Sequence, residues 1–91
     1  MPKIDRVRWT SAFKRAFRKR VMGTPDENLF RSKLETFTVD PFDPGIRTHK
    51  RSGRLEGLWA FSVSYDCRVV VRFLSDEEVL LVDIGSHDEV Y

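Results

Sequence analysis

The chain contains two histidines, His49 and His87, which lie in different kinds of sequence. His49 lies in a segment without regular hydrophobic periodicity, and His87 follows a strand-like run near the end of the sequence. Histidine is the side chain most easily poised to give and to take a proton near neutral pH. A pair of histidines therefore fits the acid and the base that cleave an RNA phosphodiester through its own 2′-hydroxyl, a reaction that needs no metal or other cofactor.

Cationic and aromatic side chains that fit the same reaction are also present. Cations stabilise the negative charge that builds up on the phosphorus oxygens, and an aromatic ring can stack on an unstacked base. The candidates are Lys50, Arg54, Arg68 and Arg72 for the phosphate, and Tyr65 and Tyr91 for a base.

Two other chemistries remain open at this point. A zinc ion bound by His49, His87 and either Asp66 or Asp83 is one of them, although that spacing matches no recognised zinc motif. Cys67 as a nucleophile is the other, but no sequence pattern marks it. We interpret Cys67 instead as a small polarizable residue in a turn.

The first half of the sequence predicts a strand and a helix. "RVRWT" alternates apolar and basic residues, as in a short half-exposed strand. Ser11 is a plausible N-cap for the helix that follows. Phe13, Phe17 and Val21 form a single apolar stripe on this helix, at i, i+4 and i+8. Gly23 is expected to end it.

A second helix is predicted directly after that glycine. In "TPDE", Thr24 is the expected N-cap, Pro25 the first helical residue and Glu27 the third residue of a capping box. The buried stripe of this helix is expected to contain Leu29 or Phe30, followed by Leu34 and Phe37. Helices joined so closely should form an antiparallel hairpin.

The next stretch, "VDPFDPGIRTHKRSGRLEG", has no clear period and is predicted to be a long loop. Beyond it the period changes to two, and "LWAFSVSY", "RVVVRFL" and "EEVLLVDI" are predicted to be three strands of an antiparallel meander. The connecting turns are expected at Asp66-Cys67 and at residues 75–77. In the middle strand, Val69, Val71 and Phe73 should face one way and Arg68, Val70 and Arg72 the other.

The predicted fold class is α+β in a single domain covering residues 1–91, with the element order β-α-α-β-β-β. The helix hairpin should pack on one face of the antiparallel sheet, so that the opposite face presents Arg68 and Arg72. Gly85 is expected to permit a turn after the last strand, and this turn would direct His87 toward that face.

Composition narrows the setting in which the protein works. Seven Phe and two Trp provide a core despite a charged fraction of 33%, which argues against disorder. A single cysteine excludes an internal disulfide, and no apolar run approaches the length of a signal peptide core or a membrane span, so we expect a cytoplasmic protein with no membrane partner. Residues 1–20 carry eight basic residues and one acid, which is typical either of a surface for a polyanion or acidic partner or of an ordinary solvated helix face.

The second half of the chain resembles a known family. "THKRSGRLEGLWAFSVSYDCRVVVRF" and "VLLVDIGSHDEVY" are similar to the RelE/YafQ-type toxins of type II toxin-antitoxin modules, within the RelE/ParE superfamily. The resemblance covers roughly residues 46–91, and the preceding strand and helix hairpin agree with it in order. It implies an mRNA interferase, which is a metal-independent endoribonuclease that cuts mRNA in the A site of the 30S ribosomal subunit. It also implies a cognate antitoxin that neutralises the enzyme.

The same resemblance implies roles for individual residues. His49 and His87 would share the acid and base roles, and Asp66 would orient one of them or the 2′-hydroxyl. Arg68 and Arg54 would hold the phosphate, and Tyr91 would stack a base or position the phosphate. The sequence departs from the family pattern at Arg51, Ser62, Cys67 and Val71.

Two alternatives to the nuclease remain. A ParE-like toxin would inhibit DNA gyrase on the same fold without cutting RNA, because fold does not fix function. It would not need His49, His87 and Tyr91. A catalytically inactive relative is the other alternative, and the departures at Arg51, Ser62 and Val71 motivate it.

Overall fold

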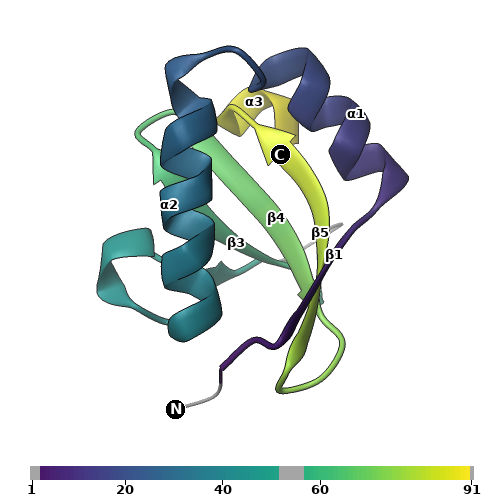
Figure 1. Ribbon diagram of the computed structural model, residues 1–91, viewed down its shortest axis with the longest axis vertical. Helices are drawn as coiled ribbons and strands as arrows, with labels where there is room; N and C mark the ends of the chain where they lie inside the picture. Colours follow the sequence, from purple (N-terminus) through teal and green to yellow (C-terminus); the bar gives the residue numbers. More distant parts are fainter. Residues whose placement is uncertain (1–2, 52–56, 91) are drawn as a thin grey trace.

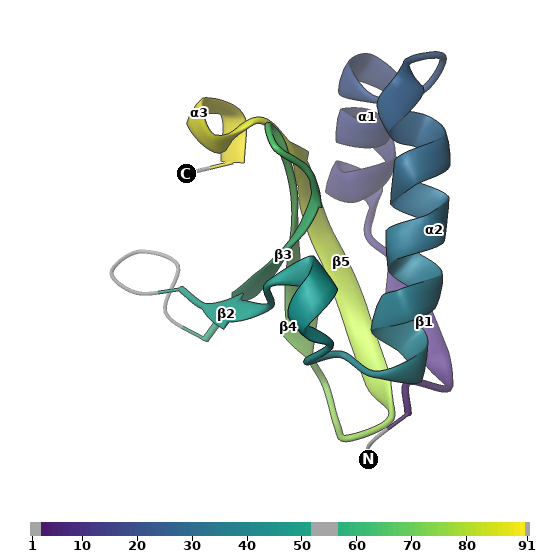
Figure 2. The same cartoon turned by 90° about the vertical axis from the view of Figure 1, so that its left-hand side faces the viewer.

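A five-stranded sheet carries a helix hairpin on one face and a short helix on the other (Figures 1 and 2). The computed structural model describes residues 3–51 and 57–90. Its elements are β1 (Arg6–Trp9), α1 (Ser11–Arg20), α2 (Pro25–Val39), the 3-10 turn η1 (Pro44–Ile46), β2 (His49–Lys50), β3 (Trp59–Ser64), β4 (Cys67–Phe73), β5 (Glu78–Gly85) and α3 (His87–Val90). The predicted α+β class and the helix hairpin are confirmed.

The sheet has the strand order β1-β5-β4-β3-β2. Strands β3, β4 and β5 form the predicted antiparallel meander, and β2 extends it antiparallel to β3. β1 differs from the all-antiparallel prediction, because it lies parallel to β5 at the edge. The chain between β1 and β5, which includes the helix hairpin and β2 to β4, provides the long connection that a parallel pair requires.

Two elements occur within the segment 39–57 that was predicted to be a loop. η1 begins after Asp43, whose side chain accepts a hydrogen bond from the Gly45 N–H at 2.8 Å. β2 is only two residues long. A two-residue strand is too short to produce a hydrophobic period, and for that reason the sequence did not reveal it.

Side-chain hydrogen bonds cap the N-termini of α1 and α2. Thr10 is the N-cap of α1, and not the predicted Ser11: its hydroxyl accepts from the Phe13 N–H at 3.1 Å and donates to the Leu81 carbonyl at 2.8 Å. The cap therefore also fixes α1 to β5. Thr24 caps α2 as predicted, and the Glu27 carboxylate accepts from the Gly23 N–H at 2.8 Å. This hydrogen bond is the main reason that the pKa of Glu27 is lowered.

Aromatic side chains dominate the core between the helix hairpin and the sheet. Trp9 packs edge-on against Phe13, Phe17 and Phe30, with ring centroids 4.9 to 5.6 Å apart. Phe30 is fully buried whereas Leu29 is exposed, which settles the phase of the α2 stripe. No helix within residues 3–51 and 57–90 has the length and apolar character needed to cross a membrane.

The predicted alternation along β4 is confirmed. Val69 and Val71 belong to the core on the helix-hairpin side, whereas Val70 packs on the other face with Leu58 and Val90. We call this second face, which carries α3, the open face. Figure 2 shows α3 on the opposite side of the sheet from α1 and α2.

Candidate active site on the open face

The strand register places the candidate residues in two neighbouring rows across the sheet. His49 on β2 pairs with Ala60 of β3, which in turn pairs with Val70 of β4. In the next row of the same face, Arg68 pairs with Gly85, the last residue of β5. Adjacent strands are about 4.8 Å apart, so roughly 14 Å separates β2 from β5, three strands away. That spacing leaves room for a nucleotide between the His49 edge and the end of β5.

His87 is the first residue of α3, and a capping box forms that helix. The Ser86 N–H donates to the Glu89 carboxylate at 2.7 Å, and the Glu89 N–H lies 3.3 Å from the Ser86 hydroxyl oxygen. The signature "SHDE" in the sequence is the signal that could have predicted this helix. Val90 is 8% exposed and packs on Leu58 and Val70, so α3 rests on the sheet while the side chain of His87 stays exposed.

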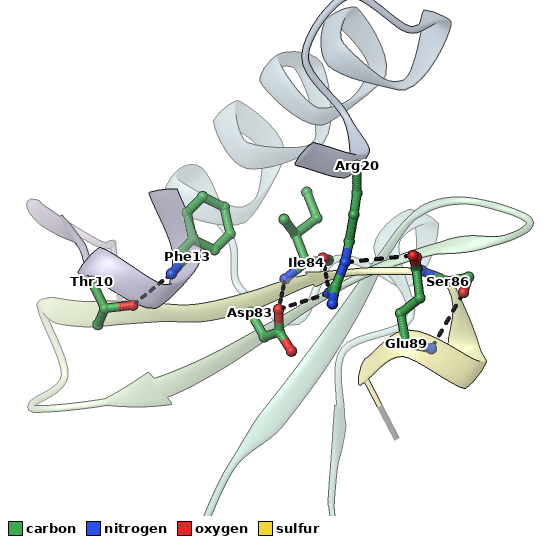
Figure 3. A network of polar contacts seen from close by, with 7 residues as sticks. All are labelled: Thr10, Phe13, Arg20, Asp83, Ile84, Ser86 and Glu89. Atoms are coloured by element: carbon green, nitrogen blue, oxygen red, sulfur yellow. Dashed lines mark hydrogen bonds and ion pairs between the residues drawn. The ribbon is translucent and has the colours of Figure 1, made fainter. Parts of the chain in front are cut away.

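Arg20, in the last turn of α1, reaches across to both β5 and α3 (Figure 3). Its guanidinium donates to the Ile84 carbonyl at 3.0 Å and pairs with the Asp83 carboxylate at 3.2 Å. Its Nε lies 3.5 Å from the Glu89 carboxylate. Arg20 therefore connects α1 to the residue that caps α3, and it is a positioning contact that sequence reasoning missed.

Gly85 has a different function from the predicted one. Its φ is not positive, because the glycines with positive φ among the described residues are Gly23 and Gly57. A Cβ at Gly85 would lie 2.8 Å from the Glu89 carboxylate and 3.0 Å from the Arg20 guanidinium. The absence of a side chain thus gives space to the contact between Arg20 and Glu89.

The hydrogen bonds of His49 define its tautomer. Its Nδ1 lies 2.9 Å from the Arg47 carbonyl oxygen, and its Nε2 lies 3.1 Å from the Arg51 guanidinium. A guanidinium can only donate, so Nε2 accepts and the ring proton is on Nδ1. Nε2 is consequently the nitrogen that can accept a proton once Arg51 is displaced. Arg51, one of the departures from the family pattern, contacts the ring of His49 directly.

The turn between β3 and β4 carries three further candidates. Arg68 is half-buried, and its guanidinium donates to the carbonyls of Ser64 and Tyr65, at 3.3 and 3.0 Å. The Tyr65 side chain is 97% exposed, and Asp66 beside it is exposed. Asp66 follows Ala60, the partner of His49, by six positions, and the four positions up to Ser64, where β3 ends, already span about 13 Å of strand. The structure thus groups Asp66 with Tyr65 and Arg68 and not with His49.

Arg72 and Lys50 lie on opposite faces of the sheet. Arg72 is exposed on the open face, with its guanidinium 3.6 Å from the position a Cβ would have on Gly57. Lys50 pairs with Trp59, and its Nζ lies 5.8 Å from the centre of the Trp59 ring. Trp59 packs against the core on the helix-hairpin side. Lys50 is therefore directed away from the face that His49 occupies.

Cys67 is the first residue of β4, and not a turn residue as predicted. It is 3% exposed and belongs to the core, where burial raises the pKa of its thiol to about 12. A thiol of this kind is a poor nucleophile near neutral pH. The predicted turn therefore consists of Tyr65 and Asp66 alone.

The zinc hypothesis has no support in the part of the chain that the structure describes. Within residues 3–51 and 57–90, no three His, Cys, Asp or Glu side chains are grouped so that they could hold a metal ion. That range includes His49, Asp66, Asp83 and His87. The predicted site residues Arg54 and Tyr91 lie outside the described residues.

Comparison with known proteins gives matches among solved structures. No protein-family model and no curated protein sequence matches the chain. A copper-bound mutant toxin from Helicobacter pylori superposes with a TM-score of 0.72 at 25% identity, covering 100% of both chains. YafQ from E. coli gives a TM-score of 0.78 at 15% identity, covering 93% of this chain and 96% of its own. YafQ in the E. coli DinJ-YafQ toxin-antitoxin complex gives 0.74 at 14% identity, covering 100% and 99%.

The chain has the fold of the RelE/YafQ-type toxins. The fold that the sequence resemblance implied is thereby confirmed. In this RelE/YafQ-type fold, the described candidate residues fall into three groups: His87 on α3, His49 on β2, and Tyr65, Asp66, Arg68 and Arg72 on or next to β4. Only Lys50 is directed to the other face.

Proposed function

We propose that the chain is the toxin of a toxin-antitoxin pair and acts as a ribosome-dependent endoribonuclease on mRNA. The observation that carries this proposal is the placement of His49 and His87 at two sides of the open face, with Arg68 and Arg72 on the strand between them. The arrangement supplies two proton-transfer groups and cations for a phosphate. The toxin structures with the same fold support the toxin role.

In the proposed reaction, the 2′-oxygen of the substrate is the nucleophile. Nε2 of His49, which is unprotonated in its tautomer, takes the 2′-hydroxyl proton after Arg51 turns toward the phosphate. The 2′-oxygen then forms a bond to phosphorus while the bond from phosphorus to the 5′-oxygen breaks. His87 donates a proton to that leaving oxygen. The products are a 2′,3′-cyclic phosphate and a 5′-hydroxyl, and no metal takes part.

The partners follow from this proposal. The message would be presented by the A site of the 30S subunit, in the cytoplasm, and a cognate antitoxin would cover or distort the open face. The E. coli YafQ structure with DinJ supports such a partner. Arg54 and Tyr91 are proposed to assist at the phosphate and at a base.

The test is His87→Ala, assayed on programmed ribosomes by mapping mRNA 5′ ends and by detecting cyclic phosphate. We expect cleavage to fall by about 10²- to 10⁴-fold, since a general acid contributes on this scale. Asp88→Asn, the exposed neighbour on α3, is the matched control and should cut like the wild type. Full cleavage by His87→Ala would refute the mechanism, and stabilised gyrase-DNA breaks with intact messages would favour the gyrase inhibitor.

A further inference from the structure

Part of the β3 edge remains open beside η1. β2 pairs only with Trp59 and Ala60, so the described chain adds no strand alongside the remainder of β3. A pocket of about 330 Å³ lies there, and we call it the β3-edge pocket. Its lining comes from α2, η1, the segment after η1, β3, the β3–β4 turn and β4, and consists of Lys33, Gly45, Arg47, Ser62, Val63, Ser64, Tyr65 and Arg68.

The charge of the β3-edge pocket is entirely positive. Three of its lining residues are cations, Lys33, Arg47 and Arg68, and none is an acid. They come from three separate elements, so only the fold brings them together. The ion pairs formed by the described residues use other arginines: Arg8, Arg20 and Arg31. Three cations around one concave surface favour an anionic ligand.

Arg47 connects this pocket to His49. It has φ 54° and ψ 43°, and it is the one non-glycine residue with positive φ among the described residues. That conformation costs about 1 to 2 kcal/mol for a residue with a Cβ. It allows the Arg47 carbonyl to accept the His49 Nδ1 proton at 2.9 Å while the Arg47 side chain lines the pocket.

On the other side of the β3-edge pocket, hydrogen bonds within the protein hold Arg68 in position. The carbonyls of Ser64 and Tyr65 fix the guanidinium of Arg68, which limits the freedom that binding would remove. The ring of Tyr65 is 97% exposed at the rim, where a base could stack on it. A phosphate in the pocket and a base on Tyr65 would belong to one extended strand. This combination favours RNA over an acidic peptide.

We propose that the β3-edge pocket binds a backbone phosphate of the RNA strand, adjacent to the phosphate that is cleaved, through Lys33, Arg47 and Arg68. The inference rests on the proposed function, because it assigns a subsite to that substrate. It moves Arg68 from the cleaved phosphate to the neighbouring one and leaves Arg72, which does not line the pocket, for the cleaved phosphate. Lys33 and Arg47 become residues for affinity and strand position that the sequence did not suggest. The phosphate they hold would fix the register of the strand relative to His49.

The test uses the full chain and a short RNA oligonucleotide with a 2′-deoxy nucleotide at the cleavage position, which binds but cannot be cut. The variants are Lys33→Ala and Arg47→Asn, since asparagine tolerates the left-handed backbone. We expect each to raise Kd about ten-fold, the loss of one charge-assisted contact, and to reduce the salt slope by about 0.7. Lys3→Ala removes one exposed cation next to β1 and should leave Kd unchanged.

Binding of inorganic phosphate, followed through the Ser62 and Ser64 amide resonances, separates this inference from the proposed function. Suppose that the chain binds phosphate and RNA, that the pocket variants lose this binding, and that the wild type never cleaves. This outcome would support the subsite and refute the nuclease. A second outcome would refute the subsite but not the nuclease. In that outcome the wild-type chain cleaves RNA, while Lys33→Ala and Arg47→Asn bind the oligonucleotide as tightly as Lys3→Ala does. Tighter binding of a polyglutamate peptide than of RNA, lost in the same variants, would also overturn it.

Discussion

Glu89 is the side chain on which the position of His87 depends most directly. Its carboxylate accepts the Ser86 N–H and also lies near the Arg20 guanidinium. The hydrogen bond from the Ser86 backbone is the main cause that lowers the pKa of Glu89, and the charge of Arg20 adds to it. The ionised carboxylate is thus the form that holds α3 together.

The position of α3 should therefore depend on pH in a defined direction. A lowered pKa means that the stabilising contribution is fully present above the ordinary value of 4.5 and is lost as the pH falls through the folded-state pKa. We expect the Ser86 amide resonance to shift and its hydrogen exchange to accelerate in that acidic range. In Glu89→Gln, which keeps an oxygen acceptor without the titration, this transition should be absent. An unchanged Ser86 amide down to global acid unfolding would contradict the prediction.

At the scale of elements, α1 holds α3 in place through one residue of its last turn. Arg20 is partly buried, with 25% of its side chain exposed, and it contacts β5 and α3 together. Within α1, which the sequence showed to be strongly basic, Arg20 is thus directed inward while Arg18 and Lys19 remain exposed. Because Gly85 has no side chain, it leaves the space in which Arg20 and Glu89 approach each other.

Replacing Arg20 should release α3 without unfolding the domain. For Arg20→Ala we expect faster hydrogen exchange at the Glu89 amide and cleavage reduced by about 10²-fold, because small misplacements of a catalytic group have effects on this scale. The free energy of unfolding should fall by no more than about 1 kcal/mol. Arg20→Lys should restore part of the activity, and Arg18→Ala, exposed on the same helix, should behave like the wild type. Normal cleavage by Arg20→Ala would show that α3 needs no such contact.

At the scale of the whole molecule, the two faces of the sheet contribute unequally to stability. The face under the helix hairpin buries a large aromatic core that includes Phe13, Phe30 and Phe37. On the open face, the described residues form a smaller cluster, in which Leu58, Val70 and Val90 are buried and Val82 is partly buried. Global folding thus rests on the first core, and the second core mainly fixes α3.

Substitutions in the two cores should consequently have different effects in urea unfolding followed by tryptophan fluorescence. Phe30→Ala removes a fully buried ring that contacts Trp9 and should cost about 3 to 5 kcal/mol of the free energy of unfolding. Val90→Ala should cost about 1.5 kcal/mol, since it removes two methylene equivalents. It should nevertheless impair cleavage, because His87 loses its support. Equal loss of stability in both variants would refute the division into two cores.

Much of the fold could be predicted from local patterns. The stripe of Phe13, Phe17 and Val21 defined α1, Thr24 and Pro25 defined the start of α2, and the period of two defined β3, β4 and β5. These signals are local, because hydrophobic periodicity and helix capping each depend on residues that are close together in the sequence. β2 was missed because two residues carry no period, and α3 because one turn of helix carries no apolar stripe.

The sequence by itself determined the α+β class, the helix hairpin, the meander and the residue types available for chemistry. Only the tertiary structure decided the parallel pairing of β1 with β5, the contact of Arg20 with Glu89, and the grouping of Lys33, Arg47 and Arg68 in one pocket. The tertiary structure also places Lys50 and His49 on opposite faces of the sheet. The physical reason is that these contacts join residues far apart in the chain. Their distances are set by strand register and helix packing, which no local pattern specifies.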